Sequence, residues 1–481
     1  MAADRESMSA VDAAWLRMDR PDNLMMIIGV WILDEPLDFA AFRQVIAERF
    51  LAFERFRYRP VDDLMSARWE LDHDFDLDAH VLRVALPGRA GKRELEALVS
   101  DLAGLALDAR RPLWQFQMVE NYAGGAAVIM RVHHCYADGI AHTGVFLSLT
   151  DTAPEPRPRA EPPAGVSRPR PGHGGTFDFV GHLHVPGADL MRQALNQGAD
   201  WIAKAADIAR HPDQANDLAR HALGMTVELA RVAALPDDAE TRLKGPLGTR
   251  KRAAWAEPLP LPEVRTVART LGCTINDVLM ATAAGALGGY LRDQGDDTDG
   301  LAIRATVPVN LRDPAEALSL GNHFGLVFLD LPIGIRDPLE RVYAVRDTMA
   351  GLKTSYQPIL MLGLMATLGV LGETAEDLAI DLLSSKATLV ASNVPGPQYQ
   401  LYLAGRRLSQ LMFWVPQSGD IGLGISILSY NGQVQFGLIA DRKRIPDPRA
   451  VAARFTSEFE TILLAVLLGP YLSRERPAGS L

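Results

Sequence analysis

The sequence has few cysteines and no excess of positive charge, and each absence excludes a class of protein. Only 2 cysteines occur among 481 residues, too few for a disulfide framework or a cysteine-based metal centre, and this scarcity is typical of a reducing compartment. The chain has 49 basic and 59 acidic residues, a net charge of -10, so it offers no general electrostatic attraction for nucleic acid. We therefore expect a cytoplasmic protein that does not bind nucleic acid.

The sequence also lacks an apolar run long enough to cross a membrane. Its most apolar stretch, residues 359–371, follows Pro358 and is interrupted by Gly363 and Gly369, and it falls short of the ~20 residues that a spanning helix needs. This stretch predicts a buried helix in preference to an interfacial or substrate-lining segment. The first nine residues do not have the pattern of a signal peptide, so export is not expected.

The residues that are present are typical of a globular protein with a substantial core. Hydrophobic residues make up 48% of the chain and charged residues 22%, and a chain of this length corresponds to roughly two or three domains. Prolines alternate with charges and glycines in residues 151–176, which predicts an exposed linker. A helical connection is expected over residues 177–240, most clearly at 217–235. The predicted units are residues 1–150 and 241–481.

Local patterns predict a mixed α/β fold of the α+β type. Asp38 is placed to cap a following helix, because its side chain can accept a hydrogen bond from a free N–H group of the first turn. Asn431-Gly432 separates two apolar stretches and is the preferred pair for a two-residue hairpin turn. Strands are predicted at residues 25–33, 113–120, 126–132, 302–309, 325–331, 424–429 and 434–440, and helices at residues 276–291 and 338–352.

The candidate catalytic segment lies at the end of a predicted strand. Its sequence is Arg-Val-His-His-Cys-Tyr-Ala-Asp-Gly, residues 131–139. Adjacent strand residues point to opposite faces, so His133 and His134 cannot both face one pocket. Counting back by twos from His134 meets only apolar residues, whereas the same count from His133 meets Arg131. His134 is therefore predicted to point inward, where an imidazole can take a proton from a hydroxyl and return it to a leaving group.

Asp138 follows His134 by four residues, and two roles for it are open. It could orient the imidazole directly, as a carboxylate does in a triad, or it could pair with an arginine and hold the turn in shape. A structural histidine is the alternative for His134 itself. Cys135 is interpreted as a packed thiol. No zinc-binding spacing, nucleophile elbow, P-loop or complete dinucleotide-binding glycine motif is present, so we expect no metal and no bound cofactor.

These residues, taken with further motifs, resemble the bacterial wax ester synthase/diacylglycerol acyltransferase family, which shares its His-His-x-x-x-Asp-Gly signature with chloramphenicol acetyltransferase-like and condensation enzymes. One departure is Met25-Met26, where the family often has Met-His, and residues 151–176 match no family motif. The matching motifs, in the family's order, are Pro112-Leu113-Trp114, His133 to Gly139, Asn276-Asp277, residues 307–312, Gly321-Asn322, Ser392 to Pro397 and Ser429 to Gly432.

The resemblance implies two chloramphenicol-acetyltransferase-like subdomains around a shared active-site tunnel. It implies an acyl-CoA-dependent O-acyltransferase that esterifies a long-chain alcohol, a diacylglycerol or both, with acyl-CoA as co-substrate. Such a protein would lie peripherally at the inner face of the membrane or on lipid inclusions. The resemblance implies that His134 is the general base and that no covalent intermediate forms. It also implies that Asp138 mainly shapes the site and that Asn276 lies near the reaction centre. His133 is the fourth candidate catalytic residue.

Several alternatives stay open at this point. Asn276 could simply cap a helix that begins at Asp277, or its amide could join backbone N–H groups in stabilising an oxyanion. The rivals in function are an acyltransferase of the same clan with another acceptor (a short alcohol, a polyketide-type hydroxyl or an amine) and a lipid-binding paralogue without catalysis. A basic cluster could bind CoA phosphates or anionic lipid, or could be a solvated face; it comprises Lys244, Arg250, Lys251 and Arg252.

Overall fold

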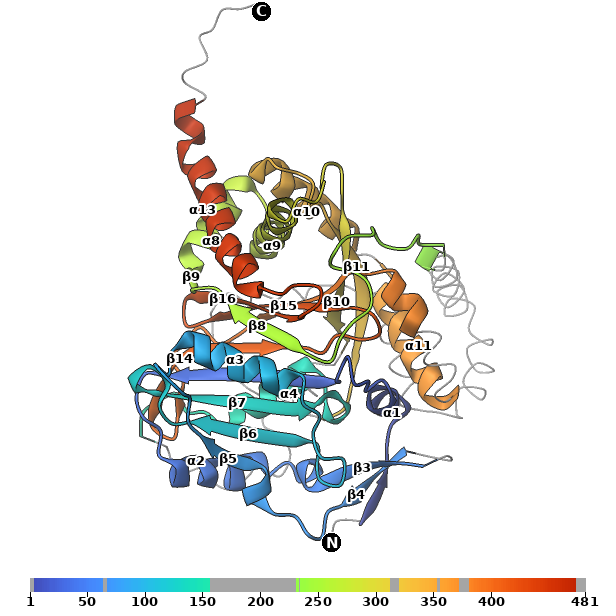
Figure 1. Ribbon diagram of the computed structural model, residues 1–481, viewed down its shortest axis with the longest axis vertical. Coiled ribbons are helices and arrows are strands. Elements are labelled where there is room, and N and C mark those ends of the chain that lie inside the picture. The colour runs from blue at the N-terminus through green and yellow to red at the C-terminus, as the bar shows by residue number, and fades with distance from the viewer. Residues whose placement is uncertain are drawn as a thin grey trace, which may run out of the picture.

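The computed structural model describes residues 4–63, 67–155, 231–232, 234–311, 320–352, 355–371 and 380–472. Two large sheets lie one above the other in the view of Figure 1, with helices packed around them, and a small third sheet flanks the N-terminal end. This arrangement confirms the predicted mixed fold. The predicted linker lies outside the described residues after residue 155, and the predicted helical connection is described only in part, from residue 231 onward.

The N-terminal sheet has six strands in the order β13-β14-β2-β7-β6-β5. β7 is antiparallel to both of its neighbours, β2 and β6, and β5 runs parallel to β6. The strands are β2 (Met26–Leu33), β5 (Val81–Val84), β6 (Trp114–Val119), β7 (Ala126–His133), β13 (Tyr402–Leu403) and β14 (Arg406–Trp414). The small sheet contains β1 (Arg5–Ser7), β4 (Ala67–Leu71) and β3 (Tyr58–Asp62).

Helices of the N-terminal half begin where the sequence supplies caps. Asp38 precedes α2 (Phe39–Val45), and its carboxylate accepts a hydrogen bond from the N–H of Ala41 at 2.8 Å, as predicted. Ser9 caps α1 (Ala10–Arg17) in the same way. The other helices are α3 (Lys92–Ala103) and α4 (Gly139–Ser148), with a π-helical turn at η1 (Ile46–Phe50) and 3₁₀ turns at η2 (Glu54–Arg57), η3 (Leu77–Ala79), η4 (Tyr122–Gly124) and η5 (His134–Tyr136).

The C-terminal sheet has the order β11-β10-β12-β15-β16-β8, with β9 beside β16. Its hairpin turns at Asn431 and Gly432, whose φ angles of 46° and 76° are those of the predicted type I′ turn. β10, β12 and β15 run parallel to one another. The strands are β8 (Lys251–Trp255), β9 (Leu259–Pro260), β10 (Ile303–Asn310), β11 (Phe324–Leu331), β12 (Leu389–Pro395), β15 (Leu423–Tyr430) and β16 (Gln433–Asp441).

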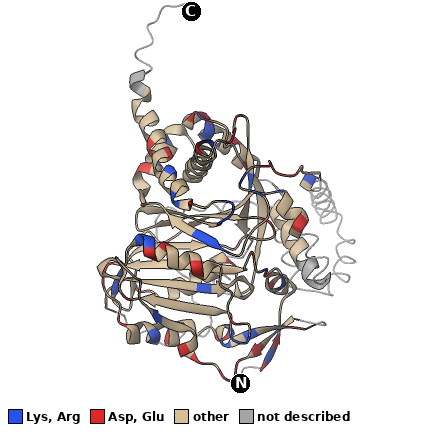
Figure 2. Ribbon diagram, viewed as in Figure 1, with Lys and Arg blue, Asp and Glu red and all other residues tan. Residues whose placement is uncertain are grey.

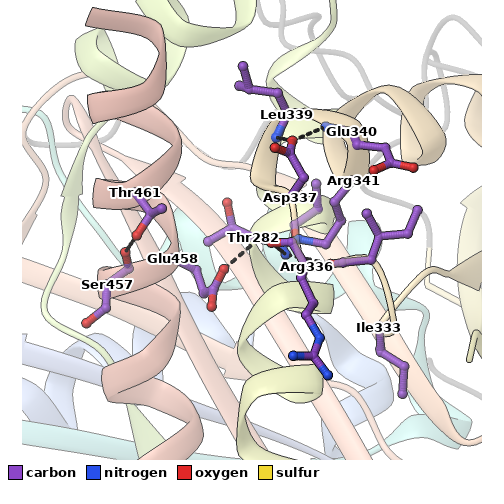
Figure 3. Close-up of polar contacts among 12 residues, drawn as sticks. Thr282, Ile333, Arg336, Asp337, Leu339, Glu340, Arg341, Ser457, Glu458 and Thr461 are labelled. Carbon is purple, nitrogen blue, oxygen red and sulfur yellow. Dashed lines mark hydrogen bonds and ion pairs between the residues drawn. The ribbon is translucent and has the colours of Figure 1, made fainter. Parts of the chain in front are cut away.

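Helices of the C-terminal half are joined by a buried arginine. The Arg341 side chain is 1% exposed and pairs with Glu458, while its Nε donates to the carbonyl of Ala281 at 2.9 Å. Figure 3 shows Arg341 and Glu458, which come from different helices, beside Thr282. Burial lowers the pKa of Arg341, and Glu458 opposes this effect. The helices are α8 (Leu261–Leu271), α9 (Ile275–Asp293), α10 (Pro338–Leu352), α11 (Gln357–Leu371) and α13 (Pro448–Leu472).

The two halves are interlocked by strands that cross between them. β13 and β14 come from residues 402–414 but extend the N-terminal sheet, with β14 antiparallel to β2. A buried polar contact joins the halves again, because the Nζ of Lys251 donates to the Oδ1 of Asn23 at 2.6 Å. The amide of Asn23 in turn donates to the carbonyls of Gly419 and Ile421. Division of the sequence at residues 150 and 241 therefore does not separate the sheets in space.

The apolar helix predicted at residues 359–371 is α11, and its Ile359 and Leu362 are buried as expected. Met361 and Met365 of the same helix line a pocket, so a buried helix and a lining segment are one element here. Within the described ranges, no single helix is long and apolar enough to cross a bilayer, although α8 and α9 together meet that criterion across a bend of 101°. Basic and acidic residues are interspersed along the described elements (Figure 2).

Candidate active site

A large apolar pocket lies between the two halves, and the His-His-x-x-x-Asp-Gly segment opens into it. Side chains of Trp15 and Met18, of the His134 turn and of the strands of the C-terminal half line this pocket together. Its polar lining includes His134, Asp138 and Asn393. The apolar lining comes from both halves and includes Trp15, Met18, Val309, Phe324, Leu326, Phe328, Met361, Met365, Ile380, Leu383, Val390, Phe413 and Ile421.

His134 lies where β7 ends and η5 begins, at the end of an alternating strand. Its own N–H donates to the carbonyl of Met25 at 2.7 Å, and its carbonyl accepts from the amide of Asn322 at 2.9 Å. The backbone of His134 is therefore held from both sides. The predicted alternation is present, because one core cluster contains Ala126, Val128, Met130 and Val132, whereas Ala127 and Ile129 belong to another.

The environment of His134 keeps its imidazole neutral. Burial lowers the pKa of His134 to about 3, and the nearby His142 acts in the same direction, while Asp138 opposes them. A side-chain interaction with Asn322 also opposes the lowering. Because this neutral ring lines the pocket, it has the protonation state of a general base.

Asp138 holds the turn that follows His134. One carboxylate oxygen accepts from the N–H of Ala141 at 2.9 Å and so caps α4, and the other accepts from the N–H of His323 at 2.9 Å. The N–H of Asp138 donates to the carbonyl of Gly321 at 3.2 Å. These contacts with backbone N–H groups support the role of holding the turn.

His133 does not line the pocket. Its Nδ1 accepts from the N–H of Cys135 at 3.2 Å, and its Nε2 lies 3.7 Å from a carboxylate oxygen of Asp19. His133 therefore stabilises the turn, whereas His134 lines the pocket. Cys135 is fully buried, which raises the pKa of its thiol well above the ordinary value and agrees with a packed thiol.

Asn276 lies one layer behind the pocket wall. Its Oδ1 accepts a hydrogen bond from the amide of Asn393, which lines the pocket. The interpretation of Asn276 as a helix cap is wrong, because Thr274 caps α9 and forms a capping box with Asp277. Thr274-x-x-Asp277 has the spacing of a capping box and was the better signal in the sequence.

The basic cluster predicted at residues 244–252 does not form a single solvated face. Lys251 is buried, and burial lowers its pKa to about 8. The Nζ of Lys244 donates to the carbonyl of Ser385 at 2.6 Å. Within the described part of the chain, no three His, Cys, Asp or Glu side chains converge where a metal ion could bind.

Three residues that contact the site were not singled out as site residues from the sequence. Trp15 stacks on the His134 ring, and Asp12 binds Asn322, which in turn binds the carbonyl of His134. A local signal for Asp12 and Trp15 existed, because Ser9-x-x-Asp12 before an apolar stretch is typical of a helix start. That signal locates α1 but does not show what the helix contacts.

Comparisons with known proteins agree with this geometry. Residues 8–279 match the wax ester synthase/diacylglycerol acyltransferase catalytic domain, and residues 320–463 match the WS/DGAT C-terminal domain. A Mycobacterium tuberculosis protein named "Probable diacyglycerol O-acyltransferase tgs1" is 28% identical over 98% of this chain and 99% of its own length.

Solved structures show the same fold at lower identity. The wax ester synthase/diacylglycerol acyltransferase from Marinobacter aquaeolei VT8 has a TM-score of 0.68 at 21% identity, covering 96% of this chain and 100% of its own. The first condensation domain of the calcium-dependent antibiotic synthetase has a TM-score of 0.57 at 13% identity, with 97% of each chain covered. From the two matching domains and this fold, the chain belongs to the wax ester synthase/diacylglycerol acyltransferase family and is an O-acyltransferase.

Proposed function

We propose that this chain transfers a long acyl group from acyl-CoA to the hydroxyl of a diacylglycerol, a long-chain alcohol or both, and so forms triacylglycerol or wax ester. The observation that carries the proposal is His134, a buried and neutral imidazole at the wall of an apolar pocket between the two halves. The names of the relatives support the lipid acceptors.

In the proposed reaction, His134 acts as general base and then as general acid. Its Nε2 takes the proton of the acceptor hydroxyl while the hydroxyl oxygen attacks the thioester carbonyl carbon, which forms a tetrahedral intermediate. The carbon–sulfur bond then breaks, and the departing CoA thiolate takes the proton from the imidazolium. The products are the ester and free CoA, and no acyl group is bonded to the protein.

The pocket has the apolar lining that a long acyl chain needs. Methionine and leucine side chains such as Met361, Met365 and Leu383 form its wall, and flexible methionines adapt to irregular apolar shapes. Asn276 contacts the pocket indirectly. Its Oδ1 accepts a hydrogen bond from the amide of Asn393, which lines the pocket.

The proposed substrates also require access to lipid, and α13 offers a surface for it. Leu464, Leu467 and Leu468 of this helix are 55%, 55% and 49% exposed. Figure 1 shows the C-terminal end of α13 projecting beyond the body. We propose that this end contacts the surface of a membrane or lipid inclusion, because exposed leucines at neighbouring helical positions favour an apolar environment.

Thiol release from palmitoyl-CoA tests the reaction, with hexadecanol, dipalmitoylglycerol or no acceptor present and the lipid product separated by chromatography. We expect acceptor-dependent release that falls at least ~100-fold in His134→Ala, the upper range for loss of a general base being ~10⁴-fold. The exposed His73 provides a matched control, and His73→Ala should retain the wild-type rate. Full activity in His134→Ala would disprove the mechanism, and bound acyl-CoA without product from either acceptor would disprove the lipid-acceptor assignment.

A further inference from the structure

We propose that Asp12 and Trp15 of α1 are positioning residues that hold the His134 imidazole in its reactive orientation, Trp15 by direct ring stacking and Asp12 through Asn322. The role assigned to the orientation rests on the proposed function of His134. Both residues lie on a helix that is distant in sequence from the His-His-x-x-x-Asp-Gly segment, and both are buried, with 4% of Asp12 and 7% of Trp15 exposed.

The start of α1 places both side chains toward the site. Ser9 caps the helix, and its Oγ accepts from the N–H of Asp12 at 3.1 Å. Residues three apart share one face of an α-helix, so Asp12 and Trp15 point the same way. The cap therefore sets the rotation of the helix that presents both side chains to η5 and to the segment that contains Asn322.

Trp15 limits the movement of the imidazole directly. The centroids of the Trp15 and His134 rings are 4.2 Å apart with an interplanar angle of 30°. Phe324 lies 5.5 Å from the imidazole centroid and 5.6 Å from the Trp15 ring. Tilting of the imidazole out of this plane would break the stacked contact, so the indole restricts the plane of the His134 ring.

Asp12 acts on the backbone of His134 through Asn322. Oδ1 of Asp12 accepts from the main-chain N–H of Asn322 at 3.1 Å and from its Nδ2 at 2.8 Å. The same Nδ2 donates to the carbonyl of His134 at 2.9 Å. Two acceptors thus meet one amide nitrogen, which determines the orientation of the Asn322 side chain, since the reverse orientation would place an oxygen against both acceptors.

The Asn322 side chain also acts on the imidazole, because its hydrogen bond with the ring opposes the lowering of the His134 pKa. Burial raises the pKa of Asp12, and the hydrogen bonds of its side chain with Asn322 and Ser9, which belong to the same network, oppose that effect.

Positioning at this site affects both geometry and protonation. Misplacement of a reacting group by about 1 Å can cost ~100-fold in rate. The titratable groups that act on the imidazole are Asp138 at the following turn, His133 at the end of β7 and His142 on α4. Removal of the indole would admit water to the ring, and a hydrated imidazole titrates closer to its ordinary pKa of about 6.5.

Titration of His134 tests the proposal without use of catalytic activity. The protein is labelled with ¹³Cε1-histidine, and the His134 signal is assigned by its absence from the spectrum of His134→Ala. We expect Trp15→Leu to raise the His134 pKa by at least about one unit, and Trp15→Phe, which keeps a ring, to restore most of the wild-type value. Asn322→Ala should change the His134 chemical shift in the neutral form, because it releases the carbonyl.

Steady-state kinetics supply the second readout. Trp15→Leu and Asn322→Ala should lower kcat by about 10- to 100-fold with a smaller change in the KM for acyl-CoA, and the acid limb of kcat/KM should move toward pH 6.5 in Trp15→Leu. Trp255 is a matched control, because it is 3% exposed, lies on β8 and does not line the pocket. Trp255→Leu should reduce stability but leave the His134 titration unchanged.

The outcomes separate this proposal from the proposed function. An unchanged His134 titration in Trp15→Leu, or an equal change in Trp255→Leu, would overturn the positioning role. If the wild-type protein transferred no acyl group, the proposed function would fail, while the titration would still decide whether Trp15 controls the imidazole. A shifted titration together with a lower kcat supports both.

Discussion

At the residue scale, burial is the main determinant of the chemistry of His134. Its neighbours stack on it or hold its backbone, and desolvation lowers the pKa of the ring to about 3. The carboxylate of Asp138 makes hydrogen bonds to backbone N–H groups. Removal of water therefore keeps this imidazole neutral, and the Asp138 carboxylate binds the backbone of the turn that follows it.

The lowered pKa predicts an unusual response to acid. The neutral form of His134 is present above its folded pKa, so the acid limb of kcat/KM should lie well below pH 6.5, with little loss between pH 8 and pH 5. Folding excludes a proton that the unfolded chain binds below about pH 6.5, so this residue makes the protein less stable as pH falls.

Urea unfolding at pH 6.5 and pH 5 measures this second effect. The contribution of His134 to the loss of unfolding free energy should be about 2 kcal/mol over 1.5 pH units. His134→Gln, which does not titrate, should lose that much less stability over the same range. An acid limb near pH 6.5, or equal acid sensitivity in the variant, would contradict the prediction.

The sequence predicts which histidine points into the pocket, because that direction depends on the alternation of residues along one strand. His134 follows an uninterrupted apolar face of β7, so its inward direction could be inferred from the sequence. Asp12, Trp15 and Asn322 could not be assigned to the site, because their contacts with His134 depend on how separate parts of the chain pack together. The capping box at Thr274 was a local signal, and it identifies Asn276 as a residue inside the helix.

At the element scale, Gly285 of α9 leaves room for the ion pair between α10 and α13. A Cβ at Gly285 would clash with the guanidinium of Arg341 and would lie 2.5 Å from the carboxylate of Glu458. These two groups form the buried ion pair of Figure 3. Removal or displacement of one partner of such a pair destabilises a protein by about 3–5 kcal/mol.

Gly285→Ala is therefore expected to lower the free energy of unfolding by about 2–4 kcal/mol. Alanine would gain about 1 kcal/mol in helix propensity, but displacement of the ion pair outweighs that gain.

Gly351 of α10 is exposed, and a Cβ added there would have no other atom within 4 Å. Gly351→Ala should consequently stabilise the protein by about 0.5–1 kcal/mol. Thermal and urea unfolding measure both, and equal effects of the two substitutions would refute this account.

Elements with strong local signals were predictable, and nonlocal pairing was not. The Asn431-Gly432 turn brings β15 and β16 together through its own backbone angles, and Asp38 caps α2 through a neighbour three residues away. β14, in contrast, pairs with β2 across most of the chain. No strand is predicted at residues 406–414, and periodicity would in any case carry no information about which sheet a strand joins.

At the scale of the whole molecule, interlocking of the halves explains why the pocket has walls from both. β14 supplies Phe413 to the pocket while it extends the N-terminal sheet, and β10 and β11 supply the opposite wall. The loop that carries Ile421 is tied to Asn23, which Lys251 also binds. The site is thus a product of the assembled chain, and neither sequence half contains it alone.

The end of α13 projects from this assembled body and gives the last prediction. Residues 461–472 contain no charged side chain. Leu464, Leu467 and Leu468 are about half exposed, so each would gain about 1 kcal/mol by leaving water, which is half of the ~1.5–3 kcal/mol for complete burial. A gain of about 3 kcal/mol corresponds to roughly a 100-fold change in partitioning.

We therefore expect the triple variant Leu464→Ser/Leu467→Ser/Leu468→Ser to bind phosphatidylcholine vesicles at least ~10-fold more weakly than the wild type in flotation assays. Its thiol release with a soluble short-chain acceptor should be unchanged, because none of the three leucines lines the pocket. Leu105, which is 57% exposed on the N-terminal half, is the control, and Leu105→Ser should float like the wild type. Equal flotation of the triple variant would place the lipid contact elsewhere, whereas concentration-dependent self-association that the triple variant abolishes would identify α13 as a surface for a second copy of the chain.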